Sequence, residues 1–198
     1  MSLLIRFRFL LMCFAATLFS GCGAPAEKVP DEPAEIDGKI GQTEQAVTKA
    51  DTDWWKNMWQ FSRNWYILTR ANQDKDLPVG LNCKEWARKV VLDASKNVVY
   101  LPQTSPDSNG WSWNSSAYTQ KLQSIYWANY GDVVQMNLSS GPHTAIIYSN
   151  DLTNICWIES NWNLDNTVHI RCQTVDSFLK SVTIGGVQRY TAYRITGG

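Results

Sequence analysis

The spacing of apolar residues changes from helical to strand-like near residue 130, and this change constrains the fold more than any other feature. Before it, apolar side chains recur at steps of three and four residues, as on one face of a helix. After it, short runs rich in Val, Ile and Tyr are separated by turn residues, as in strands. Helices followed by strands favour an α+β architecture, with N-terminal helices packed on an antiparallel β-sheet.

Two long helices and a short one are predicted in the first part of the chain. The first is capped by Asp51 or Thr52 and runs to about Arg70, the second covers residues 82–94, and the short one covers 117–125. The first carries a mostly aromatic stripe at helical spacing that we expect to pack on the core: Trp55, Met58, Trp59, Ser62, Trp65 and Tyr66. Strands are predicted at 132–136, 144–148, 156–160, 167–172 and 187–195, with a capped helix at 174–182.

Two cysteines in the last third of the chain suggest a strand register. The runs 156–160 and 167–172 have the pattern of a hairpin, and a turn centred on Leu164 places Cys156 opposite Cys172. A cross-strand disulfide is geometrically reasonable at such a pair. Disulfides persist in oxidising compartments, so this pairing suits an exported protein.

The N-terminus has the features of an export signal. Arg6 and Arg8 precede an uncharged, mostly apolar run over residues 9–19, which is too short for an ordinary membrane-spanning helix. The segment ending in Gly21-Cys22 resembles a bacterial lipobox, which predicts lipidation of Cys22 and anchoring to a membrane. Cleavage a few residues later, with free secretion, is the alternative.

These features divide the chain into three parts. Residues 1–22 are predicted to be a signal peptide with a lipobox-like end. Residues 23–50, rich in Glu, Pro and Ala, are predicted to be a disordered tether or a pro-segment. Residues 51–198 are then predicted to form one folded domain, which we expect to act as a monomer.

Composition argues against several classes of function. Lys plus Arg equals Asp plus Glu, at 18 each, and no basic stripe is present, so nucleic acid is not an expected partner. The sequence has no cluster of His and Cys at metal-ligand spacing and no phosphate-binding or dinucleotide motif. We therefore expect neither a metal nor a cofactor.

Cys83 is the candidate nucleophile. If Cys13 leaves with the signal, Cys22 is lipidated or lost and the two hairpin cysteines pair, Cys83 is the thiol that remains. It lies at the predicted start of a helix, where unpaired N–H groups and the helix dipole favour a thiolate. Asn82 can cap this helix, and the same N–H groups can stabilise an oxyanion.

The chain has two histidines that could serve as the base. His143 begins a strand that is expected to be central in the sheet, whereas His169 falls opposite Glu159 in the hairpin register. Glu159 and Asn161 share one face of their strand, and either could orient the imidazole. We favour His143, and Asp132 is interpreted as a turn residue.

The order of four segments resembles a CHAP domain, a branch of the papain-like hydrolases related to the NlpC-type cell-wall peptidases. The resemblance spans roughly residues 75–172, and the segments are Gly80-Leu81-Asn82-Cys83-Lys84-Glu85-Trp86, Gly131-Asp132-Val133-Val134, Gly141-Pro142-His143-Thr144-Ala145-Ile146-Ile147 and Ile158-Glu159-Ser160-Asn161-Trp162-Asn163. It implies a papain-like fold in which Cys83 is the nucleophile, His143 the base and Glu159 the orienting residue, with Asn161 as accessory. The family usually has Gln where this chain has Asn82.

The resemblance also implies a substrate. CHAP domains cleave peptidoglycan, either at the N-acetylmuramoyl-L-alanine amide bond or within the peptides, and the export signal agrees with such a target. Trp111, Trp113 and Trp162 are candidates for the rim of the cleft, with core packing as the alternative. Two other functions stay open: a non-catalytic module that binds cell wall, and a secreted, toxin-like amidase or peptidase with other substrates.

Overall fold

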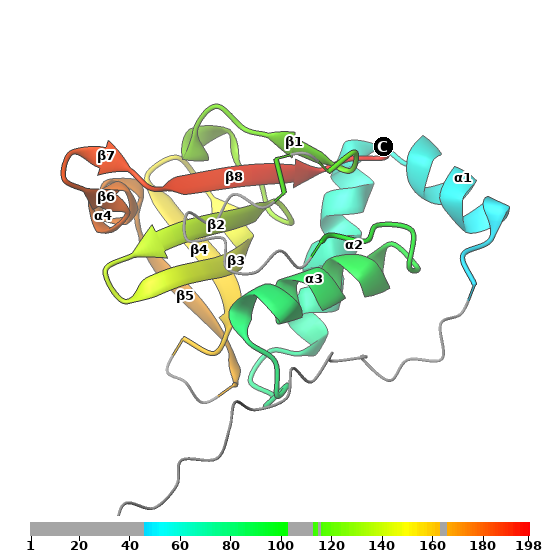
Figure 1. Cartoon of the computed structure of the whole chain (residues 1–198), viewed down its shortest axis with the longest axis horizontal. Coiled ribbons are helices and arrows are strands. Elements are labelled where there is room, and N and C mark those ends of the chain that lie inside the picture. The colour runs from blue at the N-terminus through cyan, green and yellow to red at the C-terminus, as the bar shows by residue number, and fades with distance from the viewer. Residues whose placement is uncertain (1–45, 103–112, 115, 163–165) are drawn as a thin grey trace, which may run out of the picture. The chain divides into compact units, whose positions relative to one another are not determined.

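The computed structural model describes residues 46–102, 113–114, 116–162 and 166–198 (Figure 1). Its elements are α1 (Lys49–Asn57), α2 (Gln60–Gln73), α3 (Cys83–Ala94), β1 (Thr119–Lys121), the 3₁₀ helix η1 (Ile125–Trp127), β2 (Val133–Leu138), β3 (Gly141–Asn150), β4 (Asn154–Ser160), β5 (Val168–Thr174), α4 (Val175–Ser181), β6 (Thr183–Ile184), β7 (Val187–Gln188) and β8 (Tyr190–Ile195). None of the helices in these ranges has the length and apolar content needed to cross a membrane. The predictions for residues 1–45, including lipidation of Cys22, and for Trp111 lie outside the described residues.

The fold is α+β, as predicted, with helices first and an antiparallel sheet afterwards. Six strands form the main sheet in the order β1-β8-β2-β3-β4-β5, and β6 pairs with β7 in a separate ribbon. Two apolar clusters cover the two faces of the sheet. One joins it to α2 and α3, and the other joins it to α4, which lies beside β6 and β7 in Figure 1.

Helix α3 begins where the sequence predicts. The Asn82 side chain accepts a hydrogen bond from the Glu85 N–H at 2.9 Å, and the Glu85 carboxylate accepts from the Asn82 N–H, which completes a capping box. Its buried side chains lie at helical spacing against the sheet: Trp86, Ala87, Val90, Val91 and Ala94. The cap and this apolar face together set Cys83 at the first residue of the helix.

The first predicted helix is wrong in one respect, because the chain forms two helices there. Met58 and Trp59 both have extended backbone, and Arg63 caps the carbonyl end of α1 by donating to the Trp55 oxygen at 2.8 Å. Of the predicted stripe, Trp55 is fully buried, whereas Trp59 is 84% exposed. The break changes the helical phase, so α2 buries other side chains: Asn64, Ile67 and Ala71.

The short helix predicted at 117–125 is also wrong. Residues Thr119–Lys121 pair with β8 as an edge strand, and the 3₁₀ turn η1 follows, capped by the Ser124 side chain. Strand β3 begins at Gly141, three residues earlier than predicted, because Leu138 and Gly141 already face each other across a tight turn. The pairing with β8 and the tight turn are long-range and backbone features that apolar spacing does not report.

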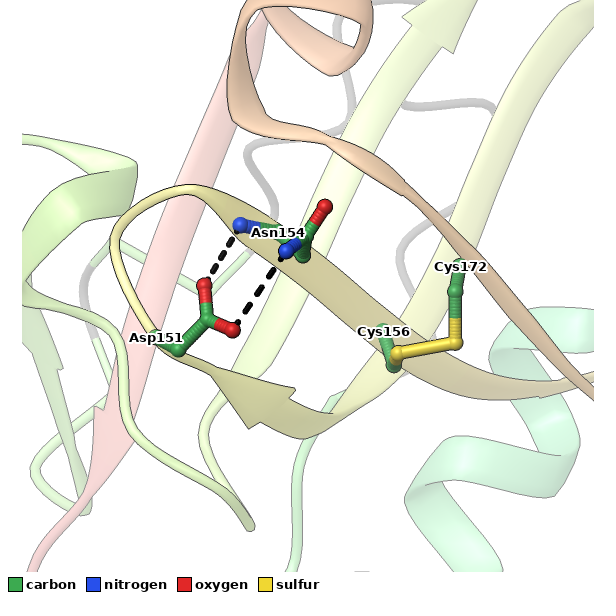
Figure 2. The surroundings of a disulfide bond; sticks show 4 residues. All are labelled: Asp151, Asn154, Cys156 and Cys172. Carbon is green, nitrogen blue, oxygen red and sulfur yellow. Dashed lines mark hydrogen bonds between the residues drawn. A yellow bond between two sulfur atoms is a disulfide. The ribbon is translucent and has the colours of Figure 1, made fainter.

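The register of the β4–β5 hairpin is as predicted. Cys156 pairs with Cys172 and Glu159 with His169. The two cysteines form a disulfide across the strands (Figure 2). In the same view Asp151 accepts hydrogen bonds from the backbone and side chain of Asn154, which fixes the turn that enters β4.

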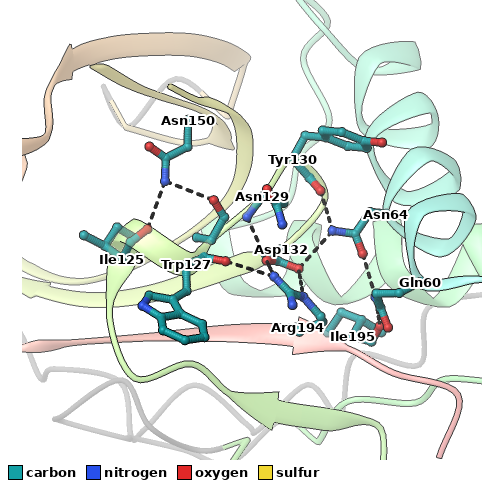
Figure 3. Close-up of polar contacts among 11 residues, drawn as sticks. Gln60, Asn64, Ile125, Trp127, Asn129, Tyr130, Asp132, Asn150, Arg194 and Ile195 are labelled. Carbon is teal, nitrogen blue, oxygen red and sulfur yellow. Dashed lines mark hydrogen bonds and ion pairs between the residues drawn. The ribbon is translucent and has the colours of Figure 1, made fainter. Parts of the chain in front are cut away.

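A buried carboxylate joins α2 to the sheet. Asp132 is fully buried and accepts hydrogen bonds from Asn64, from the Asn129 N–H and from Arg194, whose ion pair with it measures 3.0 Å (Figure 3). A Cβ on Gly131, at φ +76°, would lie 2.2 Å from the Asn64 carbonyl oxygen, so only glycine fits this contact. The bond from Asn129 agrees with the interpretation of Asp132 as a turn residue.

Candidate active site

Cys83 is the described cysteine that lies outside the disulfide, and its side chain is partly exposed. As the first residue of α3, it sits where helical N–H groups lack intrahelical partners. The backbone N–H groups of Lys84 and Thr144 donate hydrogen bonds to its sulfur. The helix end and the neighbouring strand β3 therefore both direct positive partial charge at the thiol.

The loop before α3 is joined to the end of β4, near the residues of β3 that contact Cys83. The register of β3 with β4 starts at Ile146 opposite Ile158, so Thr144 lies beyond the last pair. On the β4 side, the Ser160 hydroxyl donates to the Leu81 carbonyl at 2.8 Å. This bond ties the loop before α3 to the end of β4 and so helps to position the start of the helix.

His143 contacts both of its predicted partners. Its side chain is 10% exposed, and its Nε2 lies 2.6 Å from Glu159 Oε2. The imidazole also hydrogen-bonds the Cys83 thiol. With Nε2 engaged by Glu159, Nδ1 is the ring nitrogen available to the sulfur. His169, the alternative base, lies on β5 opposite Glu159 and one strand further from β3.

Glu159 is fully buried and is held by three side chains. Its Oε2 accepts from His143 and from the Trp157 indole N–H at 2.8 Å, and its Oε1 lies 2.7 Å from Arg171 Nε. The sequence did not single out Trp157 or Arg171. Arg171 pairs with Trp157 across the hairpin, so the predicted register could have indicated that Arg171 lies near Glu159.

The protonation states of the Cys83–His143 pair follow from these contacts. Burial alone would raise the pKa of Cys83, but the hydrogen bond and charge of His143, with the two backbone N–H groups, outweigh it and lower the pKa. Burial alone would lower the pKa of His143, but Cys83 and Glu159 outweigh it and raise the pKa to about 9. These contacts therefore favour the thiolate form of Cys83 and the imidazolium form of His143.

The other predicted site residues have different positions. Asn161 follows β4 at φ +65°, and its side-chain oxygen accepts from the Asn166 N–H, so it fixes the loop after β4 while Glu159 holds the imidazole. Trp113 is fully buried in the core beside Tyr193 and cannot line a cleft, which corrects its assignment to the rim. The Asn82 oxygen serves the helix cap.

Trp162 lies against the site. Its ring meets that of His143 edge to face, with centroids 5.0 Å apart and planes at 90°. The guanidinium of Arg171 lies over the same ring, 4.6 Å from its centroid. Trp162 therefore covers one side of the imidazole that contacts Glu159.

A cleft of about 200 Å³ opens next to these residues, on the sheet face opposite α3. Its walls combine apolar and polar side chains: Met136, Leu138, Trp157, Trp162, Arg171, Cys172, Gln173, Phe178 and Ser181. Three of them, Trp157, Trp162 and Arg171, also surround His143 or Glu159. Within the described ranges, no three His, Cys, Asp or Glu side chains group closely enough to hold a metal ion.

Comparisons with known proteins find only partial likeness. No family model matches the chain, and no curated protein matches it. A crystal structure of Ly7917 superposes with a TM-score of 0.49 at 14% identity, covering 68% of this chain and 63% of that one. Ly7917 with the hydrolysing product of MDP gives 0.48 at 12% identity, covering 67% and 63%. This chain thus spans less than two thirds of the length of those chains.

Proposed function

We propose that the protein is an exported cysteine hydrolase that cleaves amide bonds in peptidoglycan peptides through Cys83. One observation carries the proposal: a partly exposed thiol at a helix N-terminus is hydrogen-bonded to an imidazole that a buried carboxylate holds in turn. This arrangement of nucleophile, base and orienting group is what acyl transfer requires. The disulfide is compatible with an oxidising, extracytoplasmic location.

The proposed reaction has two stages. The Cys83 thiolate adds to the amide carbonyl, and the imidazolium of His143 gives its proton to the leaving amine, so that the C–N bond breaks and a thioester forms. Neutral His143 then takes a proton from water, whose oxygen attacks the thioester. The acid leaves, and the thiolate–imidazolium pair is restored.

The oxyanion formed in each stage needs hydrogen-bond donors. The start of α3 supplies backbone N–H groups, and the helix dipole adds positive potential there. Since the Asn82 oxygen faces the Glu85 N–H, we propose that the Asn82 amide nitrogen is the further donor.

The choice of substrate rests on sequence. The ordered segments around Cys83, His143 and Glu159 resemble CHAP domains, and the N-terminal signal with its lipobox-like Cys22 would place the enzyme beside the cell wall. We propose that a lipid on Cys22 is its membrane attachment. The bond would be either the N-acetylmuramoyl-L-alanine amide or one within the stem peptides.

Digestion of purified peptidoglycan tests this proposal. The mature protein should release soluble fragments whose masses show which bond is cut, and Cys83→Ala should release none. If Cys83→Ala and the native protein bind the wall equally and neither cleaves it, the protein is a non-catalytic wall-binding module. If the native protein hydrolyses small amides but leaves the wall intact, it is an amidase with other substrates.

A further inference from the structure

Four side chains around the candidate site form a closed circuit of contacts. His143 Nε2 lies 2.6 Å from Glu159 Oε2, and Glu159 Oε1 lies 2.7 Å from Arg171 Nε. The Arg171 guanidinium lies over the Trp162 ring at 4.6 Å, and the Trp162 ring meets the His143 ring at 5.0 Å. Each of the four side chains therefore contacts two of the others. Arg171 is the charged side chain separated from the Cys83 thiol by the largest number of contacts.

The charges along the line from Cys83 through His143 and Glu159 to Arg171 alternate when Cys83 and His143 are ionised. Thiolate, imidazolium, carboxylate and guanidinium follow one another, and their sum is zero. Glu159 is fully buried, and a carboxylate charge taken out of water is costly unless a cation accompanies it. Arg171, whose side chain is 33% exposed, supplies a charge that cannot be lost at any working pH.

We propose that Arg171 is a positioning residue of this site: its ion pair holds the Glu159 carboxylate toward His143, and through these two residues it maintains the reactivity of Cys83. The inference rests on the proposal that Cys83 and His143 are the reacting pair. It assigns a function in the site to a residue of β5, the strand next to β4 at the sheet edge.

Other ionisable groups face the same contacts and must be considered. Besides Cys83, His143, Glu159 and Arg171 themselves, they are Lys84 and Glu85 on α3 and His169 on β5. Glu85 serves the helix cap, and His169 lies opposite Glu159 in the register. Among all of these groups, Arg171 is the permanent cation for which the structure gives a close contact with the Glu159 carboxylate.

The guanidinium group suits this position better than an ammonium would. Its Cζ lies 4.6 Å from the centroid of the Trp162 ring while its Nε forms a 2.7 Å ion pair with Glu159 Oε1 that lacks hydrogen-bond geometry, so charge and contact with the ring account for the interaction. A lysine offers only a point charge on a flexible stem. We therefore expect Arg171→Lys to retain part of the effect, because it keeps the charge and loses the contact of the guanidinium with the ring. Arg171→Gln should lose the effect, because it removes the charge.

The pH dependence of Cys83 alkylation tests the role of Arg171. The rate of iodoacetamide labelling is followed by mass spectrometry on the Cys83 peptide of the mature protein, with no substrate present. In Arg171→Gln the profile should move to higher pH, and a shift of about one pKa unit would slow labelling by up to about tenfold at pH values below the pKa of Cys83. Arg171→Lys should lie between this variant and the native protein.

Arg194→Gln is the matched control, because Arg194 also pairs with a fully buried carboxylate, Asp132. It should lower stability and leave the alkylation profile unchanged. Equal profiles for the native protein and Arg171→Gln would overturn the inference, since Arg171 would then have only a structural role. If Arg171→Gln does not fold, Arg171→Lys and the ring NMR signals of His143 decide the question: an unchanged profile with unchanged His143 titration overturns it.

This experiment separates the inference from the proposed function. A shifted profile together with no cleavage of peptidoglycan would keep the role of Arg171 and reject the hydrolase. Cleavage of peptidoglycan by a variant series with identical profiles would keep the hydrolase and reject the role of Arg171.

Discussion

Asp132 and Glu159 are both fully buried carboxylates paired with an arginine, yet the two regions have different chemistry. The partners of Asp132 are amides, backbone N–H groups and Arg194, none of which changes charge near neutral pH (Figure 3). Glu159 has its own arginine but also contacts His143, which reaches the Cys83 thiol. The titratable imidazole between carboxylate and thiol is what distinguishes the second region.

The comparison also shows how burial and pairing compete. At Asp132, burial raises the pKa of the carboxyl although Arg194 and Asn64 act in the opposite direction. At His143, burial favours the neutral ring, but two anionic neighbours overcome it and raise the pKa to about 9. A buried ionisable group is therefore a candidate for catalysis only when its partners extend to a group that can meet a substrate.

Removing the imidazole should have the largest effect among the tests of this comparison. In His143→Ala the Cys83 thiol loses the hydrogen bond and charge that lower its pKa, while the burial that raises it remains. We expect cleavage to fall by about 10² to 10⁴-fold, the usual contribution of a general acid–base. His169→Ala is the matched variant, and an equal loss in both would show that the base has been assigned wrongly.

Removing Arg194 tests the Asp132 region, which contains no thiol. Arg194→Gln leaves the Asp132 carboxylate buried beside Asn64 without its cation, and breaking such a pair costs about 3 to 5 kcal/mol of unfolding free energy. Urea unfolding measures the loss. Activity per folded molecule should stay at the native level, and a selective loss of activity would mean that the two regions are coupled.

Removing the disulfide tests the covalent support that the Glu159 region has. The bridge joins β4 to β5 (Figure 2). The neighbouring pair in the register is Trp157 and Arg171, which contact Glu159 together with His143. For the closed loop of this hairpin, the double variant Cys156→Ser/Cys172→Ser should lose about 3 kcal/mol of stability. Hydrogen exchange should quicken in β5 and not around Asp132; uniform quickening would contradict a local role.

Neutralising Glu159 should have the smallest effect on stability and a selective effect on chemistry. Glu159→Gln keeps the shape and an acceptor for the Trp157 indole N–H but removes the charge that faces His143. The pKa of His143 should fall from about 9, and with it the thiolate fraction of Cys83 at mildly acidic pH. Labelling of Cys83 at pH values below the thiol pKa should slow by up to about tenfold if that pKa rises by about one unit. Unchanged labelling would show that Glu159 does not act on Cys83.

The parts of the site that could be predicted depend on local rules. Asn82 and Glu85 cap α3 through contacts only three residues apart, so the position of Cys83 at a helix start follows from the sequence. The hairpin register follows from two cysteines in strand-like runs, and it places Glu159 opposite His169 correctly. Because side chains alternate between the two faces of a strand, the register also predicts which side chains of the hairpin share a face.

The parts that were missed depend on long-range contacts. The break at Met58 and Trp59 is fixed by Arg63 and by the approach of Asn64 to the Tyr130 carbonyl, 66 residues away. No spacing rule reports such contacts. Asn161 was predicted to share a strand face with Glu159. Its φ of +65°, one residue after the end of β4, ends the extended backbone on which that prediction depends.

Titration of Cys83 and His143 in the native protein tests the central claim most directly. With cysteine Cβ and histidine ring carbons labelled for NMR, Cys83 should show the thiolate shift at pH 7 while the His143 ring stays protonated until the pH approaches about 9. The account is contradicted if His143 loses its proton near its ordinary pKa of 6.5 and Cys83 remains a thiol at pH 7.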